Sequence, residues 1–218
     1  MGDNTTAADP MMTTTHGALP KGPIAGIILA AGLSSRMGRM KLLMPYQKCP
    51  LLQHVVDAAR DSSLDPVIVV LGHRAHAILR QVDFENTRVV MNPDFREGQS
   101  RSLQAGLREV PQACDGALFL LGDQPRVDTT IIDDMIFRYR SGDRPIIVPV
   151  YRDKPGNPVL FGRLFFDQLM ALHGDIGGRH ILHRHEAEVM RVTVPHNGIH
   201  LDIDTWKDYR RLTANEAQ

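Results

Sequence analysis

Short apolar runs alternate with stretches of helical periodicity along most of this chain, and this alternation limits the possible folds more than any other feature. The apolar runs, each of a length typical of buried strands, are residues 24–30, 66–72, 88–92, 116–123 and 144–150. The stretches with helical periodicity are residues 50–63, 75–81, 100–110 and 129–140. Strands that alternate with helices predict an α/β fold, namely a doubly wound, mainly parallel sheet with helices on both faces.

The alternation does not extend to either end of the chain. Residues 1–22 carry acids and threonines where a signal peptide would have a basic start and an apolar stretch, so they predict a flexible N-terminal leader. We expect one domain over residues 23–213, since a chain of 218 residues suits a single α/β domain. After Val150 the rhythm breaks, and residues 151–213 predict an appended part that walls one side of the ligand site.

Charge and cysteine content exclude several classes of protein. Lys plus Arg and Asp plus Glu are equal, at 25 each, which argues against a protein that binds duplex nucleic acid or a membrane surface. The longest apolar-rich run, Ile24 to Leu33, is about half as long as the roughly 20 residues that span a bilayer. Cys49 and Cys114 are too few for a disulfide framework or a Cys-rich zinc site. We therefore expect two reduced thiols in a cytoplasmic protein.

Glycines, hydroxyls and cations are concentrated directly after the first apolar run. Gly32 and Gly38 permit tight turns. The polar residues around these glycines are Ser34, Ser35, Arg36, Arg39 and Lys41. Free backbone N–H groups with Arg and Lys at the rim suit a triphosphate. The glycine spacing excludes both GxxxxGK[S/T] and GxGxxG, and a strand-to-helix turn with solvated cations is the alternative interpretation.

Residues 29–41, LAAGLSSRMGRMK, resemble the signature loop of the MobA-like NTP transferases, and most closely that of the molybdenum cofactor cytidylyltransferases. The resemblance implies a Rossmann-like nucleotidyltransferase fold in which about residues 23–150 hold the nucleotide. The residues that would bind base and triphosphate are Leu29, Ala30, Ala31, Gly32, Ser34, Arg36 and Lys41, and the resemblance implies that Arg36 and Lys41 also act in catalysis. Guanylyl-transferring relatives tend to have Leu-Ala-Gly-Gly here, so Ala31 favours CTP over GTP.

Two acidic segments predict a metal site. Asp123 follows an apolar strand in GDQP, where a carboxylate would face the ligand crevice and could bind Mg²⁺. A capping or turn aspartate is the alternative. GDQP is similar to the metal-binding motif of the family, which implies a catalytic and nucleotide-binding role for Asp123. In relatives the aspartate before a threonine supplies a second carboxylate to the metal. This aspartate corresponds to Asp204 here, and Asp202 is the second candidate.

Further resemblance extends to the base and to the acceptor. Residues 92–106 resemble a segment beside the base, which implies hydrogen bonds from Asn92, Ser100 and Ser102, although a loop with a capped helix is the simpler interpretation. The residues that match acceptor-side segments are Asn157, Asp175, Gly177 and Arg179. The family more often has a histidine at position 157, and asparagine cannot titrate near neutral pH. Several histidines follow residue 172, but they lack HExxH spacing and a Cys partner, which favours surface or acceptor contacts over zinc.

The resemblance implies Mg²⁺-dependent transfer of CMP from CTP to molybdopterin, with release of pyrophosphate and formation of molybdopterin cytosine dinucleotide. A molybdoenzyme client, or its chaperone, would then receive the product. The alternatives are guanylyl transfer to the same cofactor and nucleotidyl transfer to a sugar or alditol phosphate. A chaperone or sensor that binds the cofactor or a nucleotide without catalysis is the alternative outside the enzyme class.

Overall fold

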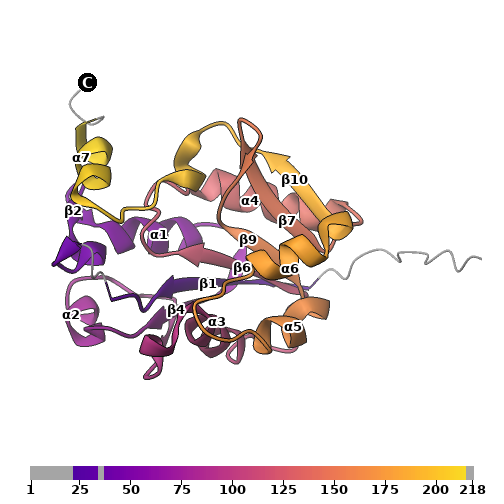
Figure 1. The fold of residues 1–218 in the computed structure, drawn as a ribbon, viewed down its shortest axis with the longest axis horizontal. Coiled ribbons are helices and arrows are strands. Elements are labelled where there is room, and N and C mark those ends of the chain that lie inside the picture. Colours follow the sequence, from indigo (N-terminus) through magenta and orange to yellow (C-terminus); the bar gives the residue numbers. More distant parts are fainter. Residues whose placement is uncertain (1–21, 34–36, 215–218) are drawn as a thin grey trace, which may run out of the picture.

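A mainly parallel sheet forms the centre of the computed structural model, which describes residues 22–33 and 37–214 (Figure 1). Its strands are β1 (Ile24–Ala30), β4 (Leu64–Leu71), β5 (Arg88–Met91), β6 (Gly116–Leu121), β7 (Ile146–Tyr151), β8 (Lys154–Pro155), β9 (Val159–Gly162) and β10 (Val189–Thr193). Their order is β10-β7-β9-β6-β1-β4-β5, with β8 paired to β7. Only β8 and β9 run antiparallel to their neighbours within this sheet of the described chain. The predicted doubly wound, mainly parallel sheet is therefore confirmed.

Helices cover both faces of the sheet, because successive strand residues point to opposite sides. Ile28 of β1 packs with α1 (Leu51–Arg60) and α4 (Thr129–Ser141) in one hydrophobic core. Its neighbour Ile27 packs with α3 (Gln99–Leu107) and α5 (Phe166–Met170) in the other core. The remaining elements are η2 (Lys41–Leu43), β2 (Pro45–Tyr46), β3 (Cys49–Pro50), α2 (Ala75–Leu79), η3 (Phe95–Glu97), η4 (Arg163–Phe165), α6 (Arg179–Arg184), η5 (Glu186–Glu188), η6 (Asn197–His200) and α7 (Trp206–Ala214).

A third, smaller core joins the C-terminal helix α7 to the segment that follows the glycine-bearing loop. Its buried members are Met37, Met44, Tyr46, Leu51, Ile203 and Leu212. Figure 1 shows α7 beside β2, although the two are far apart in the sequence. Helix α7, the last element of the predicted appended part, therefore packs against residues that follow β1.

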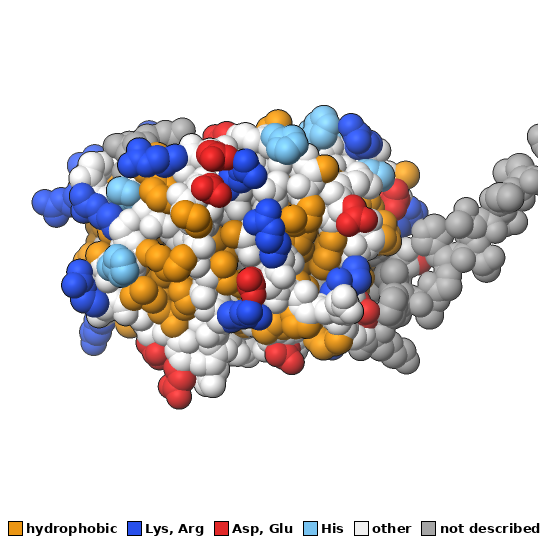
Figure 2. All heavy atoms as spheres, turned by 90° about the horizontal axis from the view of Figure 1, so that it is seen from below, with side chains coloured by type: hydrophobic (Ala, Val, Ile, Leu, Met, Phe, Trp, Pro, Cys, Tyr) orange, Lys and Arg blue, Asp and Glu red, His pale blue; other side chains and the backbone are white. Residues whose placement is uncertain are grey.

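The surface carries side chains of both charges. Over the middle of the face seen in Figure 2, cationic, acidic and apolar side chains are interspersed. Among the helices of the described residues, none combines the length and apolarity needed to cross a bilayer. The predicted leader, residues 1–22, lies outside the described residues except for Gly22.

Tyr139 of α4 offers a test of the fold that is independent of the ligand site. Its side chain is 2% exposed, and its hydroxyl donates a hydrogen bond to the backbone oxygen of Asp115 at 3.0 Å. Burial, and then the charge of Asp115, raise the pKa of Tyr139 to about 12. The stabilisation that this group provides is therefore complete below about pH 10, the ordinary pKa of tyrosine, and is lost as the pH rises towards 12.

We expect Tyr139→Phe to lower the free energy of unfolding by about 1 kcal/mol near neutral pH, because one buried hydrogen bond is lost. The corresponding fall in Tm is about 2–4 °C. The advantage of the wild type should shrink as the pH rises from about 10 to 12. Thermal unfolding across this range measures the difference, and an advantage that stays constant with pH would contradict the assignment.

Candidate active site

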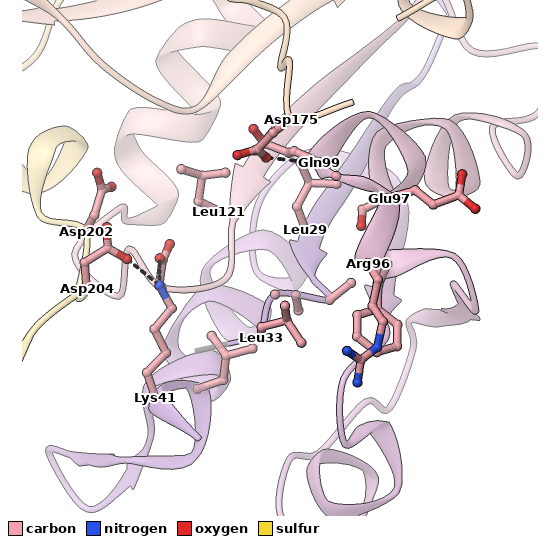
Figure 3. Close-up of a pocket in the computed structure, with 18 residues that line it drawn as sticks. Leu29, Leu33, Lys41, Arg96, Glu97, Gln99, Leu121, Asp175, Asp202 and Asp204 are labelled. Carbon is pink, nitrogen blue, oxygen red and sulfur yellow. Dashed lines mark hydrogen bonds and ion pairs between the residues drawn. The ribbon is translucent and has the colours of Figure 1, made fainter. Parts of the chain in front are cut away.

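A cavity of about 640 Å³ opens at the carboxyl ends of β1 and β6 (Figure 3). In open α/β sheets this is the edge at which ligands bind. The end of β1 and the two residues after it supply Leu29, Ala30, Ala31 and Gly32 to its wall. Leu121 and Asp123 line it from the end of β6, and Gly98, Gln99 and Ser102 line it from the start of α3. Of the residues predicted to bind base and triphosphate, these four therefore lie at the cavity.

Lys41, Asp123 and Asp204 form an ion cluster in this cavity. The Nζ atom of Lys41 lies 2.5 Å from Oδ2 of Asp123 and 2.7 Å from Oδ1 of Asp204. The side chains of Lys41 and Asp123 are 13% and 16% exposed, and that of Asp204 is 41% exposed. Burial by itself lowers the pKa of Lys41, but Asp123 and Asp204 outweigh this effect and leave its pKa raised. Lys41 is therefore cationic at neutral pH, and the two carboxylates face each other across its ammonium group.

Each member of this cluster is fixed by a different part of the fold. Lys41 begins η2, whose next residue, Leu42, is buried in a hydrophobic core. Asp123 follows β6, and the N–H group of Gly122 before it donates to the backbone oxygen of Leu29 at 3.1 Å. Asp204 follows Ile203, whose N–H group donates to the backbone oxygen of Asp123 at 3.2 Å. The main chain of the C-terminal segment is therefore attached directly to the end of β6.

Asp202 lies in the same cavity but contacts a different partner. Its Oδ1 atom accepts a hydrogen bond from Nε2 of Gln124 at 2.5 Å. Burial, and then the charge of Asp123, raise the pKa of Asp202. In Figure 3 it is Asp204, and not Asp202, that is joined to Lys41. Gln124 is only 1% exposed and was missed in the sequence, although its place directly after Asp123 in GDQP was the available signal.

The donor set at Asp123 and Asp204 fits a hard divalent cation. Two carboxylates that converge on one position offer the oxygen ligands that Mg²⁺ and Mn²⁺ prefer. Within the described ranges, no three side chains of His, Cys, Asp or Glu form a group that could hold a metal ion. A cation at this place would therefore take further ligands from phosphate and water, as is common for Mg²⁺.

The residues predicted to contact base and ribose lie in different places relative to the cavity. Ser102 lines the cavity, and its Oγ accepts a hydrogen bond from Nδ2 of Asn92 at 3.0 Å, so its own proton is available to a ligand. Asn92 is 4% exposed, and its contact with Ser102 is a buried one. The fully buried Ser100 donates a hydrogen bond from its N–H group to the backbone oxygen of Gly174. Neither Asn92 nor Ser100 is among the described residues that line the cavity. Ser34 and Arg36 lie outside the described residues.

The sequence did not reveal that a loop before α3 closes the cavity. Phe95, Arg96 and Glu97 line it from this loop. Gly98 has φ 109°, and a Cβ atom there would collide with the backbone of Gly174. This close approach brings the segment after Gly174 to the mouth of the cavity. A glycine directly before a polar helix start was the signal for it.

A second cavity, of about 290 Å³, adjoins the first. The two share a wall formed by Leu29, Gln99, Leu121, Asp175 and Asp202. All four residues predicted to bind the acceptor line this second cavity, namely Asn157, Asp175, Gly177 and Arg179. The described chain therefore presents two adjoining spaces, with the ion cluster in the larger one.

The sequence matches the model of a known protein family. The MobA-like NTP transferase domain corresponds to residues 26–189 of this chain. The molybdenum cofactor cytidylyltransferase of Escherichia coli (strain K12) is 29% identical over 192 residues, which cover 87% of this chain and 94% of that protein. The nicotine blue oxidoreductase of Paenarthrobacter nicotinovorans is 26% identical over 196 residues, which cover 87% of this chain and 96% of that protein.

Solved structures give the same result. Rv0371c from Mycobacterium tuberculosis H37Rv is 35% identical and superposes with a TM-score of 0.82, over 88% of this chain and 98% of that one. A second structure of that protein, in complex with manganese, is 34% identical with a TM-score of 0.78 and the same coverage. Because the family domain spans most of the sequence and the fold agrees, the chain is a nucleotidyltransferase and belongs to the MobA-like NTP transferase family.

Proposed function

We propose that this enzyme transfers CMP from CTP to the terminal phosphate of molybdopterin, releases pyrophosphate and forms molybdopterin cytosine dinucleotide. The observation that carries the proposal is the ion cluster of Lys41, Asp123 and Asp204 in a cavity that adjoins a second one. The larger cavity would hold the nucleotide and the smaller one the acceptor. The α-phosphorus and the acceptor phosphate would then meet where the two spaces share a wall.

The proposed reaction needs no protein nucleophile, because the acceptor phosphate already carries charge at neutral pH. One of its oxygens would attack the α-phosphorus, while the bond to the pyrophosphate oxygen breaks and the electron pair leaves with pyrophosphate. Lys41, whose raised pKa keeps it cationic, would offset negative charge that builds up on the leaving group. Arg36 is assigned the same role by its place in the motif. Positioning and charge neutralisation would thus supply most of the catalysis.

Asp123 and Asp204 would hold the divalent cation, and Asp202 is the alternative ligand. A bound cation of this kind neutralises phosphate charge as a Lewis acid. We propose Mg²⁺ as the physiological ion, and the manganese complex of the M. tuberculosis relative supports a divalent requirement. The carboxylates would orient this cation, and the shared backbone hydrogen bond between Ile203 and Asp123 would keep them at a fixed spacing.

The choice of CTP rests on the end of the first strand. Ala31 is 3% exposed and lines the cavity, and its backbone oxygen accepts a hydrogen bond from the N–H group of His73 at 3.3 Å. This bond fixes the backbone against which the base would lie. The cytidylyltransferase of E. coli is a relative over most of the chain, which supports the same preference.

We further propose that the reaction takes place in the cytoplasm and that its product passes to a molybdoenzyme or its chaperone, without nucleic acid or membrane as partners.

The full chain, incubated with molybdopterin, Mg²⁺ and each NTP in turn, should release pyrophosphate fastest with CTP. We expect kcat/KM for CTP to exceed that for GTP by at least about tenfold, since the two bases differ in size and hydrogen-bonding groups. Sugar and alditol phosphates, supplied in place of molybdopterin, should give only background release. A preference for GTP would indicate guanylyl transfer. Stabilisation by a nucleotide without pyrophosphate release would indicate a binding protein instead.

A further inference from the structure

We propose that Trp206 and Tyr209, both on α7, are positioning residues that tie the loop carrying Lys41 to the segment carrying Asp204. The inference rests on the proposed roles of Lys41 and Asp204 in nucleotidyl transfer, and it adds residues that do not themselves line the cavity. The two aromatic side chains touch each other edge to face, with ring centroids 6.0 Å apart and an interplanar angle of 88°. They thus form one aromatic unit on the first turn of the helix.

Tyr209 holds the loop on the C-terminal side of Lys41. Its hydroxyl donates a hydrogen bond to the backbone oxygen of Pro45 at 2.6 Å. The N–H group of Met44, directly before Pro45, donates to the backbone oxygen of Lys41 at 3.0 Å. A single turn of backbone therefore connects the anchored Pro45 to Lys41, so that a shift of Tyr209 would be passed on to the lysine.

Trp206 holds the loop on the N-terminal side of Lys41. The guanidinium carbon of Arg39 lies 5.8 Å from the centroid of the Trp206 ring, within the range of a cation–π contact. Arg39 precedes Lys41 by two residues, and Trp206 follows Asp204 by two residues. This contact therefore joins the near neighbours of both charged groups.

The helix itself is a firm support for these contacts. The carboxylate of Asp208 accepts a hydrogen bond from the N–H group of Thr205 at 2.8 Å, and Oγ1 of Thr205 accepts one from the N–H group of Asp208 at 3.3 Å. This reciprocal pair caps the start of α7. Ile203 and Leu212 bury both ends of the segment in the third core. Loss of the aromatic contacts would move Lys41 relative to Asp123, and misplacement by about 1 Å can lower a rate by about 10²-fold.

The test uses Trp206→Ala and Tyr209→Phe in the full chain, with Thr213→Ala as the matched control. Thr213 lies on the same helix, and its hydroxyl donates hydrogen bonds to the carbonyl oxygens of Tyr209 and Arg210 within that helix. We expect each aromatic variant to lower kcat for pyrophosphate release by about tenfold, with a much smaller change in KM for CTP. Trp206→Phe should restore most of kcat, because a phenyl ring keeps the contact with Arg39. The control should keep the wild-type kcat.

A second measurement is independent of turnover. Trp206 is the only tryptophan in the sequence, so tryptophan fluorescence reports on the surroundings of this side chain. Arg39→Ala should make the fluorescence of the unliganded protein easier to quench with acrylamide. Quenching that is unchanged in Arg39→Ala, or a kcat within twofold of the wild type in both aromatic variants, would overturn the inference. An equal loss of kcat in Thr213→Ala would do the same, since it would show a general effect of weakening the helix.

Failure of the proposed function would be recognised separately. A wild type that releases no pyrophosphate with any NTP would refute nucleotidyl transfer to the acceptors tested. The positioning role would then be decided by the affinity of the same variants for Mn²⁺ alone, measured by titration calorimetry. We expect the affinity in Trp206→Ala to differ several-fold from that in Thr213→Ala, because a shift of Lys41 or Asp204 changes the charge and the spacing of the carboxylates, and equal affinities would overturn the inference.

Discussion

Replacing Asp123 by asparagine should lower pyrophosphate release by at least about 10³-fold while the fold remains intact. The loss follows from removing one of the two carboxylates that face each other across Lys41. An asparagine oxygen can still accept the hydrogen bond from Lys41, and Asp204 remains as its ionic partner. The cost to stability should therefore stay within a few degrees of Tm. Steady-state rates with CTP, Mg²⁺ and molybdopterin, together with a thermal melt, measure both effects.

Asp134→Asn is a suitable control for this experiment. Asp134 pairs with Arg138 on the exposed side of α4, away from both cavities. The substitution also neutralises a paired acid, so any general effect of lost charge should appear in both variants. If Asp123→Asn kept more than about a tenth of the wild-type rate, the metal and catalytic roles assigned to Asp123 would be wrong.

Replacing Lys41 by methionine should lower the rate by about 10²–10³-fold, because one preorganised charge is lost from the transition state. The affinity for the metal ion should change in the opposite direction. In the wild type the Lys41 ammonium compensates Asp123 and Asp204, so its removal leaves two neighbouring carboxylates without a counter-charge. Affinity for Mn²⁺ in the absence of nucleotide should therefore rise, whereas in Asp123→Asn it should fall.

The comparison of these two variants separates catalysis from metal binding. Titration calorimetry with Mn²⁺ gives the affinities, and pyrophosphate release gives the rates. Lys48→Met, in the turn between β2 and β3, removes an exposed lysine that lines neither cavity and should leave both quantities unchanged. A Lys41→Met variant that releases pyrophosphate at the wild-type rate would show that Lys41 has no catalytic role. A variant that loses metal affinity together with activity would contradict the proposed electrostatic balance.

Much of the fold was predictable because it depends on local patterns. Apolar runs such as residues 24–30 and 116–121 become central strands because each can be buried on both faces, and this is visible in the sequence alone. The helix at Leu51–Arg60 follows from apolar residues that recur on one face. The strand β9, antiparallel to its neighbours, could not be placed in this way, because its position depends on which strands it meets.

Residues of the candidate site were predictable only where they lie in a recognisable sequence motif. Lys41 and Asp204 are separated by 163 positions, and no local pattern shows that they will form an ion pair. Resemblance placed both residues, but it did not show that α7 packs against the loop. Asn92 and Ser100 were assigned to the ligand because residues 92–106 resemble a family segment beside the base. Amides and hydroxyls also suit buried support, and only the three-dimensional structure shows that both residues are buried and that Asn92 contacts Ser102.

The proposal that Asp123 and Asp204 share a divalent ion beside a nucleotide is tested most directly by crystallography. Crystals of the wild type, grown with Mn²⁺ and a CTP analogue that cannot be hydrolysed, would be measured at the manganese absorption edge. We predict an anomalous peak in direct contact with oxygens of both carboxylates and of the nucleotide phosphates. A peak bound to neither carboxylate, or a nucleotide seated away from Lys41, would contradict the proposal.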